Sequence, residues 1–214
     1  MNQLKQKGFT LVEIAIVLVI VGLLIGGVLK GQEMITNAKL KRLESDNAGI
    51  AAAMFSYQDR YLQLPGDDAG VEDRFSVYTD ATYVGGSGIG DGLIDGVWNT
   101  TGVTTPFEET QLFWAHLRAA GLVPGGGEDV SLASNAYGGQ IGIQDGSLDI
   151  AGHVTIFGAI EGPIAKILEG RLDDKKPDTG RIQSAISGSS MAVSTTGAAS
   201  SYEDNKRYDM AFRL

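Results

Sequence analysis

Residues 9–29 read FTLVEIAIVLVIVGLLIGGVL, a run of 21 residues in which Glu13 is the one charged side chain. At a rise of about 1.5 Å per residue, a helix of this length reaches roughly 31 Å, which matches the hydrocarbon core of a bilayer, about 30 Å thick. A secretory signal peptide would have a shorter apolar region followed by an A-x-A-like cleavage site. This run instead leads into a second helical pattern, so we expect it to anchor the chain in a membrane.

A short motif crosses the start of this run. Residues 7–13 read KGFTLVE, which resembles the processing signal of type IV prepilins and type II secretion pseudopilins. The resemblance implies that a prepilin peptidase cuts between Gly8 and Phe9 on the cytoplasmic face and methylates the new amine of Phe9. Glycine suits the position before the cut because it lets the chain lie extended in a peptidase cleft without a side chain.

Glu13 is a residue that a simple anchor would not need. A carboxylate in the hydrocarbon costs about 2.5 to 3.5 kcal/mol on the insertion scale, so it requires a partner. The resemblance implies that this partner is the N-terminal amine of a neighbouring subunit, which would make Glu13 a sensor of correct assembly. The alternative is a glutamate placed shallowly enough to reach the lipid headgroups.

The second helical pattern predicts that the anchor continues as an amphipathic stalk. Its apolar and small positions recur at alternating steps of four and three: Thr36, Leu40, Leu43, Asn47, Ile50, Met54, Tyr57 and Tyr61. Pro65 and Gly66 then break the helix. We therefore predict one helix over 9–61. Its four clustered glycines favour either local melting on filament assembly or close helix packing: Gly22, Gly26, Gly27 and Gly31.

The sequence predicts three parts: a cleaved leader (1–8), a transmembrane and stalk helix (9–61) and a globular head (62–214). In the head we expect turns over 64–105, a helix from Thr105–Pro106 to Gly121, strands at 139–144 and 153–160, a helix over 163–172, a long loop or mobile flap over 183–201 and an edge or closing strand at 208–214. The expected fold is α+β and type IV pilin-like, with the long helix packed on a small antiparallel β-sheet head.

The segment GDGLIDG, residues 90–96, is a candidate calcium loop. Asp91 and Asp95 offer hard oxygen ligands on a glycine-rich turn, and major pseudopilins of the resembling family use a calcium loop in place of a disulfide, which fits a chain without cysteine. An EF-hand would also need acidic ligands where Ser87, Ile89 and Trp98 stand. Solvated acidic turns are the alternative, although Asp67, Asp68 and Asp73 could add ligands.

A second loop, LDDKKPDTG at 172–180, resembles a D-D-x-x-P-x-x-G loop of large pilin-like proteins. Its adjacent Asp173 and Asp174 suit capping or turn chemistry better than an acid/base pair. We expect His116 and His153 to be structural, and none of the common catalytic motifs is present. The sequence therefore does not predict an enzyme.

Together these features predict a structural filament subunit that acts in type II protein secretion or pilus assembly. By resemblance, its partners are other pilin-like subunits, the prepilin peptidase, an inner-membrane platform protein and a motor ATPase, and its head lies in the periplasm before the filament forms. The net charge of −9, which becomes −11 when two leader lysines are removed, argues against nucleic-acid binding. The alternative is a minor or tip subunit that binds a surface, DNA or cargo, which exposed aromatics around Tyr78, Tyr83 and Trp98 would favour.

Overall fold

A computed structural model describes residues 9–78, 88–102, 106–193 and 197–214. By its internal contacts the chain divides into two compact units, residues 1–41 and 42–214.

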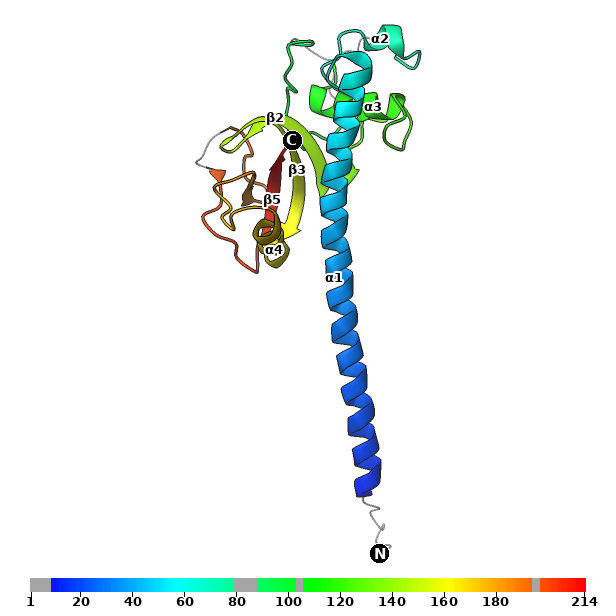
Figure 1. The fold of residues 1–214 in the computed structure, drawn as a ribbon, viewed down its shortest axis with the longest axis vertical. Coiled ribbons are helices and arrows are strands. Elements are labelled where there is room, and N and C mark those ends of the chain that lie inside the picture. The colour runs from blue at the N-terminus through cyan, green and yellow to red at the C-terminus, as the bar shows by residue number, and fades with distance from the viewer. Residues whose placement is uncertain (1–8, 79–87, 103–105, 194–196) are drawn as a thin grey trace, which may run out of the picture. The chain divides into compact units, whose positions relative to one another are not determined.

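One long helix, α1 (Leu11–Tyr61), begins in the first unit and supplies its last turns to the second (Figure 1). The predicted long N-terminal helix is therefore present, and it ends where the sequence indicated. Leu62 takes a φ of 58° directly after the last helical residue, a left-handed conformation that stops a right-handed helix.

The first half of α1 has no cover from its own unit. An 18-residue window of this helix has a mean hydropathy of 2.8 and is 0% buried. The helix is unbroken through Gly22, Gly26, Gly27 and Gly31, and a Cβ added at any of the four would meet nothing within 4 Å. This segment fits a membrane anchor by length and composition.

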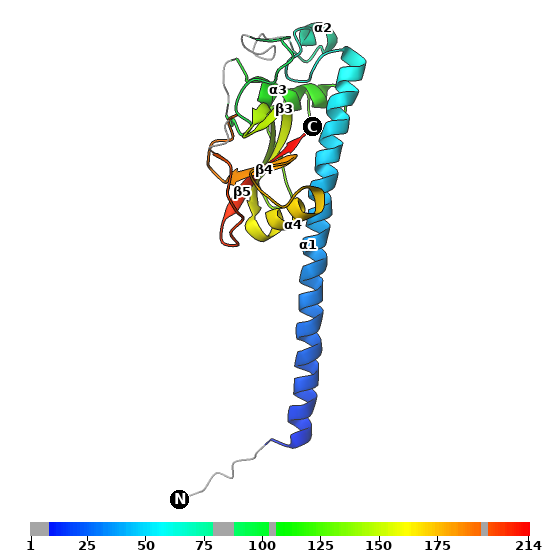
Figure 2. The same cartoon turned by 60° about the vertical axis from the view of Figure 1, so that its left-hand side comes forward.

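The second unit is built on one antiparallel sheet. After α1 the elements are α2 (Val71–Arg74), α3 (Glu109–Ala119), β1 (Ala133–Ser134), β2 (Gln140–Ser147), β3 (Ile150–Glu161), α4 (Gly162–Leu172), β4 (Ile182–Ile186) and β5 (Arg207–Arg213). The strands pair in the order β1-β2-β3-β5-β4. Figures 1 and 2 show α3 and α4 at opposite ends of this sheet. The α+β architecture predicted from the sequence is confirmed.

One prediction about the end of the chain is confirmed in part, and another is wrong. A final strand, β5, is present as predicted, but it is not at the edge, because it lies between β3 and β4. The segment 183–201 is not all loop, because β4 extends to Ile186 and pairs with β5. The residues of β4 from Ile182 to Ala185 are buried on both faces, so its small and polar side chains give no alternating pattern that a sequence could reveal.

Alternating residues of β3 divide the head into two layers. Val154 and Ile156 point into a core cluster with Trp98 and Met191. Thr155, which lies between them, points to the opposite face, where its hydroxyl donates to the side-chain oxygen of Asn47 on α1. Of the predicted amphipathic stripe on the second half of α1, the apolar side chains of Leu43, Ile50, Met54 and Tyr57 are buried, with relative exposures of 6% or less. Asn47 and Tyr61 of the same stripe are half-buried.

Candidate functional site

The first turn of α1 holds Glu13 in a hydrogen-bonded cap. The backbone N–H and the hydroxyl of Thr10 each donate to Glu13 Oε2 at 2.8 Å, and the Glu13 N–H donates back to Thr10 Oγ1 at 3.3 Å. This reciprocal pair is a capping box, in which a Ser or Thr before the helix and a Glu three residues later satisfy free backbone donors. The pattern T-x-x-E at 10–13 is the sequence signal for this cap, whereas the partners predicted for Glu13 lie outside the chain.

The cap binds the Glu13 carboxylate to Thr10, the second residue after the predicted cleavage point. Thr10, the donor to Glu13, directly follows Phe9, which is 83% exposed. Gly8, on the other side of the predicted cut, lies outside the described residues. The described structure therefore has both Phe9, which would carry the new amine, and the Thr10–Glu13 cap at an exposed helix start.

The candidate calcium loop brings its two aspartates together. A Cβ built on Gly88 would lie 3.2 Å from Asp95 Oδ2 and 3.5 Å from Asp91 Oδ2, so both carboxylates face one point. Both side chains are exposed, and Asp91 Oδ1 accepts the N–H of Leu93 at 2.9 Å. Neither belongs to a group of three acidic or histidine side chains with ligand atoms within 4.8 Å of one another in the described part of the chain.

Two buried carboxylates from outside this loop fix its backbone. Asp67 accepts the N–H groups of Gly90 and Gly92, the latter at 2.7 Å, and Glu109 Oε2 accepts the N–H of Asp95 at 2.8 Å. Burial raises the pKa of Asp67, and burial together with the nearby aspartates raises the pKa of Glu109 to about 7. Glu109 was not among the ligands considered from the sequence, where its position at a helix start had a simpler explanation.

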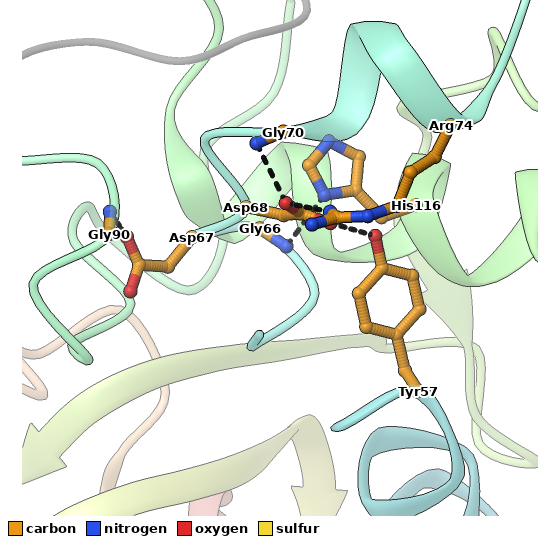
Figure 3. A network of polar contacts seen from close by, with 8 residues as sticks. All are labelled: Tyr57, Gly66, Asp67, Asp68, Gly70, Arg74, Gly90 and His116. Carbon is orange, nitrogen blue, oxygen red and sulfur yellow. Dashed lines mark hydrogen bonds and ion pairs between the residues drawn. The ribbon is translucent and has the colours of Figure 1, made fainter. Parts of the chain in front are cut away.

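Asp68 has a different role from its neighbour. Figure 3 shows it at the centre of a buried network, in which Tyr57 donates to Asp68 Oδ2 at 2.7 Å and Arg74 donates to both oxygens. The Gly70 N–H donates to Asp68 Oδ1 at 2.9 Å. These donors occupy the carboxylate, so Asp68 is not a free ligand for the 90–96 loop.

The histidines take structural positions. His116 is 0% exposed, and its Nδ1 accepts the N–H of Gly66 at 3.0 Å (Figure 3). His153 lies in β3 with its Nδ1 3.3 Å from Asp145 Oδ1. The two histidines therefore serve different parts of the fold.

Two of the three aromatic residues that would have favoured a binding surface are buried. Tyr78 is 2% exposed and Trp98 is 4% exposed, and both belong to the core. Tyr83 lies outside the described residues.

The D-D-x-x-P-x-x-G loop follows α4 and performs the predicted turn chemistry. Asp174 accepts the Lys176 N–H at 2.9 Å and the Thr179 hydroxyl at 2.6 Å. Asp173, the C-cap residue that follows α4, accepts the N–H of Ile182 at 2.6 Å. A Cβ on Gly180 would lie 2.2 Å from Asp173 Oδ2, which explains the glycine at this position of the motif.

Comparison with known families identifies the start of the chain. Residues 3–29 match the family model of the prokaryotic N-terminal methylation motif, which is the type IV prepilin signature. Proteins with this motif are structural, and the motif implies processing by prepilin peptidase and assembly with other pilin subunits. Searches of curated proteins and of solved structures give no significant match.

Proposed function

We propose that the chain is a structural subunit of a type IV pilus-like filament that acts in type II protein secretion or pilus assembly. One observation carries the proposal: the N-terminal methylation motif at 3–29 coincides with a fully exposed apolar helix that has Glu13 in its first turn. An apolar surface of this size needs lipid or neighbouring subunits to cover it. In a filament subunit, lipid covers this surface before assembly and neighbouring subunits cover it afterwards.

The proposed pathway begins in the bacterial inner membrane. A prepilin peptidase removes the leader (1–8) by cutting after Gly8, and the amine of Phe9 is methylated. The stem and stalk (9–61) then leave the bilayer for the filament, and the head (62–214) faces the periplasm or the outside. A platform protein and a motor ATPase supply the machinery for this step.

The capping box gives Glu13 a defined position before assembly. Thr10 holds one carboxylate oxygen in place through two donors, beside the residue whose amine becomes charged after cleavage. We propose that the Glu13 charge then pairs with the Phe9 amine of a neighbouring subunit, which would offset the cost of a carboxylate in an apolar surrounding.

Substitutions at two positions separate the charge of Glu13 from its capping role. Glu13→Gln keeps a side chain that can complete a capping box but removes the charge, whereas Thr10→Val removes the hydroxyl and keeps the charge. We expect Glu13→Gln to be cut normally but to be nearly absent from sheared filaments, and Thr10→Val to enter them. The readout is the fraction of subunit in the sheared and the membrane fractions of a host with the matching assembly system.

The opposite pattern would contradict the proposed role of Glu13. If Glu13→Gln enters filaments as the unmodified chain does, and Thr10→Val does not, the carboxylate serves only to cap the helix. The filament proposal would then rest on processing alone.

We also propose that Asp91 and Asp95 hold a calcium ion. Support comes from their convergence on Gly88 and from the two buried carboxylates that fix the loop backbone around them. The double variant Asp91→Asn/Asp95→Asn should lower the calcium affinity of the chain. An unchanged calcium titration would contradict this site.

A further inference from the structure

A second acidic group lies in the head, far along the chain from the 90–96 loop. Glu169, Asp173 and Asp174 each place one carboxylate oxygen within 4.8 Å of the corresponding oxygens of the other two. Calcium binds oxygen ligands at about 2.4 Å, so two ligands on opposite sides of the ion are about 4.8 Å apart. The three oxygens therefore lie close enough together for one calcium ion to bind all of them after small side-chain movements.

Glu169 has an oxygen that the described protein leaves without a partner. The residue is 0% exposed. Its Oε2 accepts the Tyr202 hydroxyl at 3.1 Å, but its Oε1 is buried and receives no hydrogen bond. A buried carboxylate oxygen without a donor is costly, and this one belongs to a side chain that contributes to the acidic group.

The position of Glu169 and Asp173 makes their negative charges still less favourable. Glu169 is in the last turn of α4 and Asp173 is its C-cap, where the helix dipole favours cations and disfavours anions. None of the three carboxylates forms an ion pair with a described Lys, Arg or His. All these effects would be relieved by a bound cation.

We propose that Glu169, Asp173 and Asp174 form a binding site for one divalent cation of the calcium type. The ligands are all carboxylate oxygens, which suit a hard cation. Asp174 is exposed and Asp173 is half-buried, so water can complete the coordination shell. With three protein carboxylates and water, an affinity in the range of extracellular calcium modules is expected, a Kd of roughly 0.1 to 1 mM.

A cation here would connect three segments of the head. Glu169 belongs to α4, and Asp173 and Asp174 belong to the loop that leads to β4. Tyr202, which donates to Glu169, also shares a hydrogen bond of 2.8 Å with Ser184 of β4. The ion would therefore hold the end of α4, the motif loop and the segment before β5 together. Both aspartates of the D-D-x-x-P-x-x-G loop would be ligands of the same ion.

The test is a calcium titration of the full-length chain in detergent after treatment with a chelator, followed by calorimetry and by thermal unfolding. We expect calcium to raise the Tm by several degrees and magnesium to do so less. Changes to residues around a metal cost roughly 10- to 100-fold in affinity even when they are not ligands. Glu169→Gln and Asp174→Asn should therefore each weaken calcium binding by about tenfold or more.

Two controls make the result specific to this site. Asp178→Asn changes an exposed aspartate of the same loop that is outside the acidic group, and it should bind calcium as the unmodified chain does. Asp91→Asn/Asp95→Asn removes the other proposed site, and it should leave the binding that depends on Glu169 intact. Because Asp174 is exposed, its variant should fold even if Glu169→Gln does not.

Two outcomes would overturn the inference. One is calcium binding that is unchanged in both Glu169→Gln and Asp174→Asn. The other is no calcium-dependent rise in Tm. Neither outcome bears on the filament proposal, because the titration involves no assembly step.

Discussion

The carboxylate of Asp68 fixes the turn that follows α1. It is 0% exposed and accepts hydrogen bonds from Tyr57, Gly70 and Arg74. A buried carboxylate is stable only when its lone pairs are satisfied by donors or charge. The residue therefore joins the stalk helix to α2 through one buried group, and its partners are the places to test this junction.

Replacing Tyr57 with Phe should weaken the junction without a change in shape. The variant loses a hydrogen bond to a charged group, so we expect the free energy of unfolding to fall by about 1.5 to 3 kcal/mol at pH 7. Guanidinium unfolding of the full-length chain in detergent measures it. Tyr61→Phe is a matched control, since the Tyr61 ring packs on that of Tyr57 with centroids 4.6 Å apart. A loss of equal size in the control would contradict the account.

The same hydroxyl predicts a pH dependence at alkaline pH. Burial and the hydrogen bond to Asp68 raise the pKa of Tyr57 above its usual value near 10. Above pH 10 the folded chain therefore keeps a proton that the unfolded chain loses, and stability falls as the pH rises. The stability gap between the unmodified chain and Tyr57→Phe should narrow by about 1.4 kcal/mol between pH 9 and pH 11. A constant gap would show that Tyr57 ionises normally in the fold.

At the scale of elements, β2 passes unusually close to the chain before α3. A Cβ added to Gly142 would lie 1.8 Å from the carbonyl oxygen of Trp98. A backbone atom cannot move away as a flexible side chain can, so this position of β2 admits only glycine. The contact holds the strand against the segment that carries the core residue Trp98.

We therefore expect Gly142→Ala to cost about 3 kcal/mol or more of stability, the upper range for overpacked positions. Gly49→Ala is its opposite, because Gly49 lies inside α1 with nothing within 4 Å of an added Cβ. That variant should be more stable than the unmodified chain by up to about 1 kcal/mol. Thermal unfolding compares them, and equal effects at the two glycines would refute the predicted close approach.

Substitutions at Gly26, in the apolar part of α1, can show whether the glycines there serve close helix packing or local melting. Gly26 sits in an unbroken helix with open space around it, so we expect packing against other helices to be its use. Gly26→Ala should then still enter filaments, whereas Gly26→Leu should not, as scored in sheared fractions. If Gly26→Ala alone blocks assembly, stiffening of the helix is the cause and local melting is supported.

The sequence predicted those elements whose pattern is local. The steps of four and three that predicted the stalk bury Leu43, Ile50 and Tyr57, and α3, β2, β3 and α4 lie where composition placed them. The position of β5 inside the sheet and the existence of β4 depend on pairing between distant segments. Small residues buried on both faces carry no period, so these features could not be read along the chain.

The candidate sites also divide into features that a local motif predicts and features that depend on distant segments. The motif at 7–13 is continuous, so the predicted cleavage point and the predicted role of Glu13 rest on it alone. By contrast, Asp67 and Glu109 reach the 90–96 loop, and Tyr202 reaches Glu169, from distant parts of the chain. Such contacts arise from tertiary structure, and no spacing rule relates the residues concerned.

The whole molecule joins two compact units that differ in their surroundings. Residues 42–214 have a core and a paired sheet of their own. The first unit, residues 1–41, carries the apolar part of α1, in which an 18-residue window is 0% buried. The exposed apolar surface of such a helix is covered only in lipid or by other subunits. The proposed function places the chain in both of these surroundings.

The most direct test of that assignment is the intact mass of the membrane-bound chain, expressed with and without a prepilin peptidase. The account predicts that the peptidase removes residues 1–8 and that the product, which begins at Phe9, carries one added methyl group. Without the peptidase the mass should be that of the full chain. A chain that stays uncut beside an active peptidase would contradict the proposal and leave an anchored head without a filament role.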